Sequence, residues 1–380
     1  MKQKVDKMET LKINYLMYGM ERTGGTRVLF NFMNELVNLG HEISITTLNV
    51  DKWFPLSPDI KIISKKTKFD INYLYGVKLI GRNNKILKNI FILNKLKEIT
   101  PMTDINVATF SPTAYLASWK SGDGSTPFYH MQHLESIMFN DPLMKKFVVD
   151  SYFLPMHKIA NSKWLSDQLF KLTGNKYQVV NAAIEHNIFF KRNTSNNNLI
   201  KRNDKEIHIV ALGKGGWKNA RGIFDAVNRV RKDSTAKKII LHYFGHKALS
   251  NIPFDGNYNI FHKDITDEDL AILYSNSDIQ ITFSTAESFP LPPLEAMSCG
   301  TAVITTPAGT EDYTVDFENS LIVEPNNIHM LADKIKILIE DEELRIKIGK
   351  SGIKTANKFK YSNQVKMLES ELKKSLDEKM

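Results

Sequence analysis

The sequence predicts two α/β domains of the Rossmann type that face each other across a cleft. Three observations support this prediction. The chain has 380 residues, which is enough for two domains of ordinary size. Strand and helix patterns alternate in both halves, which favours parallel sheets, and a polar segment separates the halves. We place the domains at residues 1–190 and 191–360 and expect a C-terminal helix, residues 361–380, to pack back on the first domain.

The first half alternates between expected strands and helices. Strands are expected at residues 12–20, 42–48, 104–110 and 128–131, with edge strands at 159–161 and 178–181. Helices are expected at residues 26–39 and 84–99 and from about residue 162. The helix at 26–39 has apolar residues at helical spacing and ends at Gly40, which favours a helix end.

The second half repeats this alternation after the polar linker at residues 191–206. Strands are expected at residues 207–212, 238–244, 278–284, 301–305 and 321–323. Helices are expected at residues 221–230 and 267–276 and over most of the last 50 residues. Asp267 and Asp269 form a D-x-D pattern, which is known in metal sites. We assign them to helix capping because they follow Thr266, the expected N-cap.

The composition indicates anionic ligands rather than nucleic acid. The chain carries 51 Lys and Arg against 42 Asp and Glu, a formal charge of +9, which suits an anionic ligand or an anionic membrane surface. No cluster of Lys and Arg with interleaved aromatic residues marks a nucleic-acid site. The helix at 85–98 has a basic polar side that suits either a membrane surface or, as we favour, a helix covering a sheet.

The sequence also predicts a cytoplasmic location. Cys299 is the only cysteine, so it cannot form an internal disulfide, and we expect a small buried helix residue in a reducing compartment. The sequence contains no apolar run of about 18 residues, and the N-terminal segment lacks the pattern of a signal peptide. We therefore expect a cytoplasmic protein, with the inner face of a membrane as a candidate place of work.

The segment ESFPLPPLE, residues 287–295, carries the strongest functional signal. It places Glu287 on the loop after an expected strand and Glu295 in the first turn of the following helix. Pro292 and Pro293 suit a helix start, and Gly300 suits its end. Ligands of open α/β sheets bind beside such loops, and a helix N-terminus favours an anion. A ligand with both phosphate and hydroxyl groups, such as a nucleotide-sugar, fits this combination.

This segment resembles the Glu-x7-Glu motif of glycosyltransferase family 4, whose members are retaining enzymes of GT-B fold. The resemblance continues in residues 309–312 and 318–323, and upstream in LAILYSNSDIQITFS. It implies that Glu287 contacts the transferred sugar and that Glu295 holds the ribose hydroxyls, roles that suit carboxylate acceptors. Pro290 departs from the family, which has glycine there. Since proline has no N–H, the phosphate contacts are left to the backbone of Ser288, Phe289 and Leu291.

A basic glycine-rich turn follows the first strand of the second half. Gly213 lets the backbone approach an anion, and Lys214 and Lys218 suit the neutralisation of a diphosphate leaving group. The family has two basic residues at this place, both on the diphosphate. Lys218 matches the second at a shorter spacing than usual, and Arg221 is the alternative. A basic surface turn is the other interpretation.

Two features of the first half resemble the family more weakly. Gly24 and Gly25 lie where the first strand meets its helix and resemble the family's glycine loop, although a plain tight turn gives the same pattern. Family members place a histidine near the reacting carbon, and His133 is the better match, with His130 as the alternative. His130, His133 and Glu135 are also the residue types of a metal site, but they have no fourth ligand.

The resemblance therefore implies a GT-B, family-4-like retaining glycosyltransferase. The second domain is expected to bind a nucleotide-diphosphate sugar without a metal or other cofactor, and the first to hold the acceptor. The acceptor class stays open between glycan, lipid-linked, protein and small-molecule acceptors, with cell-envelope glycan synthesis favoured. Alternatives are a GT-B epimerase or phosphorylase and a non-catalytic subunit that binds a nucleotide-sugar or glycan.

Overall fold

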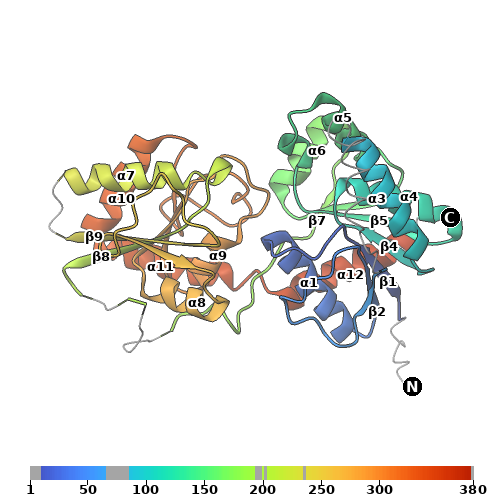
Figure 1. The fold of residues 1–380 in the computed structure, drawn as a ribbon. Coiled ribbons are helices and arrows are strands. Elements are labelled where there is room, and N and C mark those ends of the chain that lie inside the picture. The colour runs from blue at the N-terminus through green and yellow to red at the C-terminus, as the bar shows by residue number, and fades with distance from the viewer. Residues whose placement is uncertain (1–9, 66–84, 193–198, 201–202, 234–236, 378–380) are drawn as a thin grey trace, which may run out of the picture. The chain divides into compact units, whose positions relative to one another are not determined.

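The chain forms two compact units, each built around a parallel sheet (Figure 1). The structure is a computed structural model that describes residues 10–65, 85–192, 199–200, 203–233 and 237–377. Unit 1 comprises residues 1–161, 165–180 and 361–380, and unit 2 comprises residues 162–164 and 181–360. The chain thus passes into unit 2 at residue 181, ten residues before the expected boundary, and returns to unit 1 at residue 361.

The described residues of unit 1 form a seven-stranded sheet in the order β3-β2-β1-β4-β5-β6-β7, with all neighbours parallel. Parallel pairing buries both faces, so most strand residues are inaccessible to solvent. The strands are β1 (Lys12–Leu16), β2 (Glu42–Thr46), β3 (Lys61–Ile63), β4 (Ile105–Ala108), β5 (Thr126–Met131), β6 (His157–Ala160) and β7 (Gln178–Val179).

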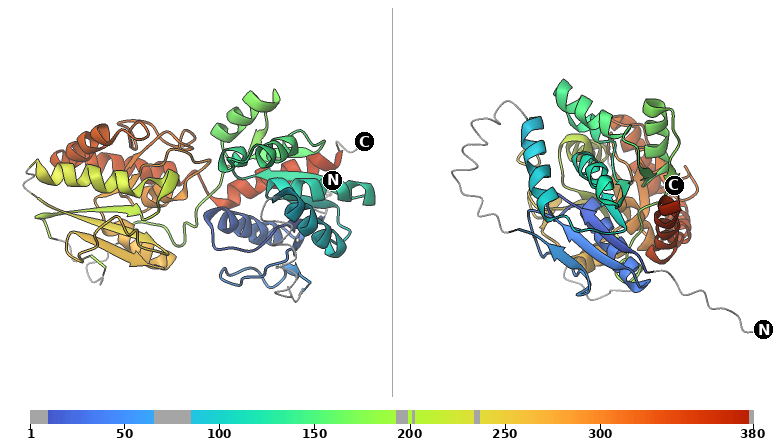
Figure 2. Two further views of the ribbon diagram at one scale, coloured as in Figure 1. Left: turned by 45° about the horizontal axis from the view of Figure 1, so that its top comes forward. Right: turned by 90° about the vertical axis from the view of Figure 1, so that its right-hand side faces the viewer.

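Helices pack on both faces of this sheet. On one face, α1 and α12 lie side by side, with the rings of Phe32 and Tyr361 5.4 Å apart (Figure 2). On the other face, α4 packs on β4 and β5, and α3 and α5 pack on α4. The last helix of the chain is therefore part of unit 1. The helices are α1 (Gly24–Asn38), α3 (Lys85–Ile99), α4 (Ser111–Lys120), α5 (Pro142–Ser151), α6 (Lys163–Thr173) and α12 (Tyr361–Asp377).

The described residues of unit 2 form a six-stranded parallel sheet in the order β10-β9-β8-β11-β12-β13. This is the strand order of a dinucleotide-binding Rossmann fold. The strands are β8 (Glu206–Leu212), β9 (Lys238–Gly245), β10 (Asn259–Lys263), β11 (Ile279–Thr282), β12 (Ala302–Thr305) and β13 (Leu321–Ile322).

The helices of unit 2 also cover both faces of the sheet. α7 and α10 pack side by side on one face, where they enclose an apolar core with alternate strand residues (Figure 2). On the other face, α9 packs against α8 and against α11, and all three helices contact strands of the sheet. The helices are α7 (Ala220–Lys232), α8 (Asp267–Asn276), α9 (Leu291–Ser298), α10 (Ile328–Glu340) and α11 (Glu342–Ala356).

The alternating pattern predicted from the sequence is confirmed in both units. The hydroxyl of Thr266 accepts the N–H of Asp269 at 3.1 Å, so the acidic residues begin α8 as expected. The structure adds β3, β10, α4 and α5, which the sequence pattern does not indicate. Helix α3 contacts α4 and α5. Of the described helices, none combines the length and apolar character that a bilayer crossing requires.

Candidate functional site

The candidate site lies in unit 2 at the carboxyl ends of β8 and β11. These strands are neighbours in the sheet but not in the sequence, so the strand order reverses between them. Loops after such strands diverge to opposite faces and leave a crevice where ligands of this fold class bind. The basic turn at residues 213–218 follows β8, and the Glu287 loop follows β11. The fold therefore brings together two segments that the sequence marks separately.

Lys218 and Glu287 form an ion pair across this crevice. Their side chains are 19% and 9% exposed, so the pair is largely shielded from water. The hydroxyl of Ser284 also donates to Oε1 of Glu287, at 3.0 Å. A shielded carboxylate needs such partners, because an uncompensated buried charge is costly.

The two loops are also joined through the backbone. The N–H of Thr285 donates to the carbonyl of Trp217 at 2.8 Å and so joins the two loops. The hydroxyl of Thr306, which follows β12, donates to the carbonyl of Ser284 at 2.7 Å. A small gap lies beside these contacts and is lined by Leu212, Lys218, Ile223, Ile281, Thr282, Phe283, Ser284, Pro290 and Pro292. The backbone contacts hold the Lys218 turn and the Glu287 loop in a fixed relation to each other.

Glu295 lies within α9 and is 3% exposed. It is the fifth residue of the helix, beyond the first turn, because α9 begins at Leu291. The charges of Glu287 and Glu295 both act on Tyr313, whose pKa lies well above its usual value, mainly because of burial and then because of these and neighbouring carboxylates. The structure thus places both glutamates of the sequence motif around one buried tyrosine.

Pro290 is the N-cap of α9, and its carbonyl accepts the hydroxyl of Tyr313 at 2.7 Å. The first four N–H positions of a helix have no partner inside the helix and are available to a ligand. In α9 three of these positions are proline, residues 290, 292 and 293, so Leu291 supplies the one N–H. The start of α9 therefore offers a phosphate fewer N–H donors than the positive end of a helix dipole alone would suggest.

Gly309 is a site residue that the sequence motif does not identify as such. Its φ is +71°, and a Cβ atom here would lie 2.5 Å from the carbonyl oxygen of Ser288 and 2.7 Å from that of Glu287. Only glycine allows the backbone of residue 309 to lie this close to the backbone of the Glu287 loop, against which it packs. The sequence signal was present in residues 309–312, but their spatial relation to Glu287 depends on the fold.

The other residues that the sequence predicts to bind the nucleotide-sugar differ in their surroundings. Lys214 is exposed, and its Nζ lies 5.8 Å from the ring centroid of Trp217. Gly213 is buried against Tyr243, which a Cβ would approach at 3.2 Å. Arg221 is engaged elsewhere, because its Nε donates to Asp225 at 2.9 Å. Lys218 is therefore the basic residue of this turn that reaches Glu287. Ser288 and Phe289 are buried.

In unit 1, Gly24 and Gly25 are the first two residues of α1, at the carboxyl end of β1. Thr23 caps this helix by accepting the N–H of Thr26 at 3.2 Å. Neither glycine has a positive φ, and a Cβ at either position would meet no atom within 4 Å. The backbone conformation does not require glycine at these positions. Because the two glycines have no side chains, nothing at these positions covers the N–H groups at the start of α1.

The histidines of the first half point to different surroundings. His133 follows β5 and is partly exposed, whereas His130 is fully buried against Phe32 of α1. Burial lowers the pKa of His130 to about 3. Glu135 instead contacts Ser111 at the start of α4, on the opposite face of the sheet. Among the described residues, these three side chains form no group that could hold a metal ion.

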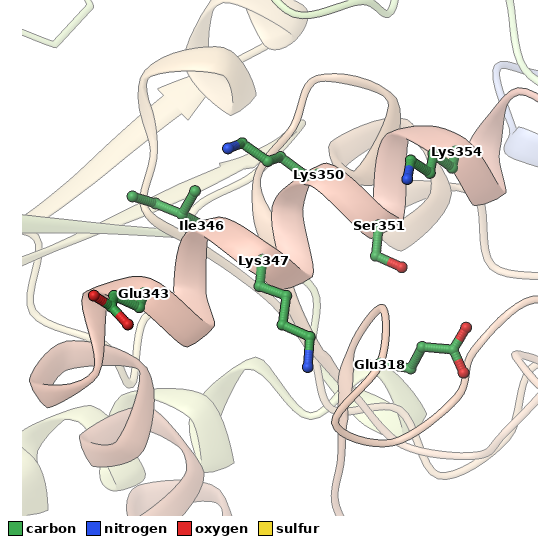
Figure 3. A pocket seen from close by; sticks show the side chains of 7 residues that line it. All are labelled: Glu318, Glu343, Ile346, Lys347, Lys350, Ser351 and Lys354. Carbon is green, nitrogen blue, oxygen red and sulfur yellow. The ribbon is translucent and has the colours of Figure 1, made fainter.

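A larger groove of about 550 Å³ lies on α11, away from the predicted residues. It is lined by Glu318, Glu343, Ile346, Lys347, Lys350, Ser351 and Lys354. Figure 3 shows that Lys347 and Lys350 extend to opposite sides of the helix, so the lysines do not converge on one point. We therefore place the candidate site at β8 and β11 rather than in this groove.

The thiol of Cys299 is buried and takes no part in the candidate site. Cys299 is fully buried at the C-terminal end of α9, and burial raises the pKa of its thiol to about 12. A thiol in this state is a poor nucleophile, because the thiolate is the reactive form. The interpretation of Cys299 as a buried helix residue is confirmed.

Comparison with protein families gives a match within unit 2. Residues 191–355 match a family model described as glycosyl transferases group 1. Among curated relatives, a D-inositol 3-phosphate glycosyltransferase of Corynebacterium glutamicum is 32% identical over 103 residues, 27% of this chain and 25% of the relative. An N,N'-diacetylbacillosaminyl-diphospho-undecaprenol alpha-1,3-N-acetylgalactosaminyltransferase of Campylobacter jejuni is 32% identical over 92 residues, 24% of each chain. Both matches span about a quarter of the relative's length.

Comparison with solved structures identifies the fold over nearly the whole chain. The Anabaena protein HepE, in complex with UDP and glucose, aligns with a TM-score of 0.72 and 14% identity. The alignment covers 96% of this chain and 99% of HepE. With its two parallel-sheet α/β domains, the chain has the GT-B fold predicted from the sequence.

Proposed function

We propose that this protein is a retaining glycosyltransferase that moves a sugar from a nucleotide-diphosphate sugar to an acceptor hydroxyl. The observation that carries the proposal is the Lys218–Glu287 ion pair at the carboxyl ends of β8 and β11. It joins a cation suited to a diphosphate and a carboxylate suited to a sugar at the crevice where this fold class binds nucleotides. The match of residues 191–355 to glycosyl transferases group 1 supports the same activity.

The proposed reaction breaks the bond between the sugar's anomeric carbon and the diphosphate oxygen. The electron pair of this bond stays with the diphosphate, and Lys218 and Lys214 lower the energy of the developing negative charge. The acceptor oxygen forms the new bond on the same face of the sugar, and its proton passes to the departing phosphate oxygen. Glu287 accepts hydrogen bonds from the sugar hydroxyls, and Glu295 from the ribose.

The first domain is proposed to hold the acceptor. Gly24 and Gly25 leave the start of α1 uncovered at the carboxyl edge of the sheet. His133 follows β5 at the same edge, where residues of adjacent parallel strands meet. No metal is required in this scheme, since lysines and backbone N–H groups take up the negative charge.

UDP-glucose is the first donor to test, because HepE, which shares this fold, forms complexes with UDP and UDP-glucose. For the acceptor, a lipid-linked intermediate of cell-envelope glycan synthesis is the favoured class. The Campylobacter relative, whose name specifies a diphospho-undecaprenol acceptor, supports this choice. A formal charge of +9 suits work at the cytoplasmic face of an anionic membrane.

A non-catalytic subunit that binds nucleotide-sugars is the second candidate function. The prolines at positions 290, 292 and 293 favour it, because they remove three N–H groups that a catalytic phosphate site would use. The third candidate is a GT-B epimerase, which would act on the nucleotide-sugar alone, or a GT-B phosphorylase, which would cleave a glycan with inorganic phosphate. Product analysis with and without an acceptor, and with a glycan and inorganic phosphate, separates these candidates.

The deciding experiment has two stages. A thermal-shift panel of nucleotide diphosphates and their sugars identifies the donor, since a ligand that binds the native state raises its melting temperature. The best donor is then incubated with and without lipid-linked and sugar acceptors, and the products are analysed by NMR. A new glycoside with the donor's anomeric configuration supports the proposal. Binding without any product supports the non-catalytic candidate and refutes transfer.

A further inference from the structure

Glu135 is a buried carboxyl group that joins two segments at the carboxyl edge of the sheet in unit 1. It is 3% exposed. Its Oε2 accepts the backbone N–H of Ser111 at 2.9 Å and also the hydroxyl of Ser111. Its Oε1 accepts the hydroxyl of Tyr129 at 3.2 Å. Three donors, two from Ser111 at the start of α4 and one from Tyr129 on β5, therefore converge on a single carboxyl group.

These contacts fix the loop that carries His133. The loop begins where β5 ends, at Met131, and Glu135 opens the short 3₁₀ turn that follows. Ser111 is the first residue of α4, so Glu135 attaches the loop to the start of that helix. The adjoining N–H of Ser136 donates to the hydroxyl of Tyr152 at 3.4 Å. The loop is thus held by the sheet on one side and by Glu135 on the other.

The protonation state of Glu135 changes within the physiological range. Burial raises the pKa of Glu135 to about 7, although the hydrogen bonds from Ser111 and Tyr129 oppose the shift. The titratable groups that face it are Tyr18 after β1, Tyr129 on β5 and Tyr152 after α5, each of which has a raised pKa for which the Glu135 charge is a secondary cause. As a neutral acid, Glu135 keeps an acceptor oxygen for Ser111 and turns its own O–H toward the phenol of Tyr129.

We propose that Glu135 is a positioning residue, which fixes the His133 loop to the start of α4 and holds it more tightly as the neutral acid than as the carboxylate. The sign follows from linkage. A closed loop that binds the proton more strongly than an open, solvated loop is stabilised by protonation. Closure is therefore strongest at acidic pH and weakens as the pH rises to about 7. The anchoring of the loop stands independently of the proposed function. The effect of this anchoring on turnover, through the position of His133, rests on the proposed function.

Hydrogen exchange of the full chain tests the anchoring without any ligand. In the wild type, the protection factors of amides at residues 132–138, corrected for intrinsic exchange, are expected to fall more than tenfold between pH 5 and pH 7.5. Glu135→Gln, a neutral isostere, should keep the loop protected and remove this pH dependence, whereas Glu135→Ala should lose protection at every pH. A wild-type loop without pH dependence, or an unchanged loop in Glu135→Ala, overturns the proposal.

Two further variants keep this test decisive if Glu135→Ala does not fold. Ser111→Ala removes one donor to the carboxyl group and should lower protection of the same loop severalfold. Thr266→Ala removes a helix cap in the other unit and should leave residues 132–138 unchanged. Equal effects of both variants on the loop would mean a general loss of stability and would contradict a specific anchor.

Turnover separates this inference from the proposed function. With UDP-glucose as probe, UDP affinity should be the same in all variants, because the candidate nucleotide site lies in unit 2. The rate of UDP release should fall at least tenfold in Glu135→Ala and be restored in Glu135→Gln. If the wild type binds UDP but releases none from UDP-glucose or any other donor of the panel, the proposed transfer fails while the exchange result stands. If release is equal in all variants, the positioning role fails.

Discussion

Lys218 and Glu287 form an ion pair that links the loops following two neighbouring strands, β8 and β11. The residues are far apart in the sequence, and each was expected to contact a different part of the donor. Their pairing means that the cation next to the departing diphosphate also orients the carboxylate next to the sugar. Loss of either residue therefore affects the other.

Glu287→Gln is expected to lower kcat about a hundredfold or more, because an oriented charge at the reacting centre is lost, while the donor still binds. Lys218→Met should also lower kcat and should weaken nucleotide-diphosphate binding. Each single change leaves a shielded charge without its partner and should cost roughly 3 kcal/mol of stability. Steady-state kinetics, donor titration and urea unfolding measure these effects.

Asp225→Asn provides a matched control for this pair. It breaks the ion pair of Asp225 with Arg221, whose side chains are 36% and 48% exposed, and exposed pairs contribute about 0–1 kcal/mol. Activity and stability should stay close to those of the wild type. If Asp225→Asn lowers turnover as strongly as Lys218→Met, the loss in Lys218→Met is not specific to the Lys218–Glu287 pair.

Gly309→Ala should weaken donor binding although no charged residue is replaced. The new methyl group would overlap the carbonyl oxygens of Ser288 and Glu287, at 2.5 and 2.7 Å, and push the loop away from Lys218. The positive φ alone costs about 1–2 kcal/mol for an alanine, and the overlap adds to this cost. Donor affinity and melting temperature should both fall.

Gly256→Ala separates backbone strain from steric overlap. Gly256 has a φ of +73°, close to the +71° of Gly309, but a Cβ there meets nothing within 4 Å. The variant should lose a similar strain energy and keep its donor affinity. If both alanine variants bind the donor equally well, the support that Gly309 gives to the Glu287 loop is not required for binding.

Gly24→Ala and Gly25→Ala should lower activity without lowering stability. Both positions are helical and uncrowded, so alanine should leave stability unchanged or raise it by about 0.5 kcal/mol. The methyl groups would cover N–H groups that we expect an acceptor to approach, so the rate with acceptor should fall while donor affinity is kept. Melting temperature and transfer rate are measured on the same preparations, and a stabilised enzyme with full activity would remove these glycines from the site.

The sequence predicts local features of the fold better than distant ones. Thr266 and the acidic residues after it specify the start of α8 by themselves, because capping involves neighbours in the chain. Helix α4 has no such signal. Its buried residues include Ser111, Thr113 and Lys120, so its apolar face is weak and its position depends on packing against β4 and β5.

The same distinction applies to the candidate site. Glu287, Glu295 and Lys218 were found from their motifs, since these residue types stand next to strand ends. The pairing of Lys218 with Glu287, the support from Gly309 and the engagement of Arg221 by Asp225 depend on which strands become neighbours. Pro290 illustrates the limit most directly. The sequence shows that its N–H is missing, but only the structure shows that its carbonyl holds Tyr313.

A row of three histidines should make unit 2 sensitive to acid. His208, His242 and His262 lie on the adjacent strands β8, β9 and β10, with hydrogen bonds of 3.0 Å between successive rings. Burial, and then the neighbouring histidines, lower the pKa of His242 to about 3 from the ordinary value of 6.5. As the pH falls below 6.5, the unfolded chain takes up a proton that the folded chain excludes. Stability is therefore complete above pH 6.5 and is lost as the pH falls toward 3.

For His242 alone, this linkage corresponds to about 2 kcal/mol of unfolding free energy lost between pH 7 and pH 5. Urea unfolding of the wild type at both pH values, at constant ionic strength, gives the total loss. In His242→Gln, which cannot take up this proton, the loss should be smaller by about that amount, whatever the variant's stability at pH 7. The comparison uses the difference between two pH values in each protein, so a general destabilisation by the substitution cancels. Equal losses in both proteins would mean that His242 keeps its ordinary pKa and that the buried row is not the acid-sensitive element.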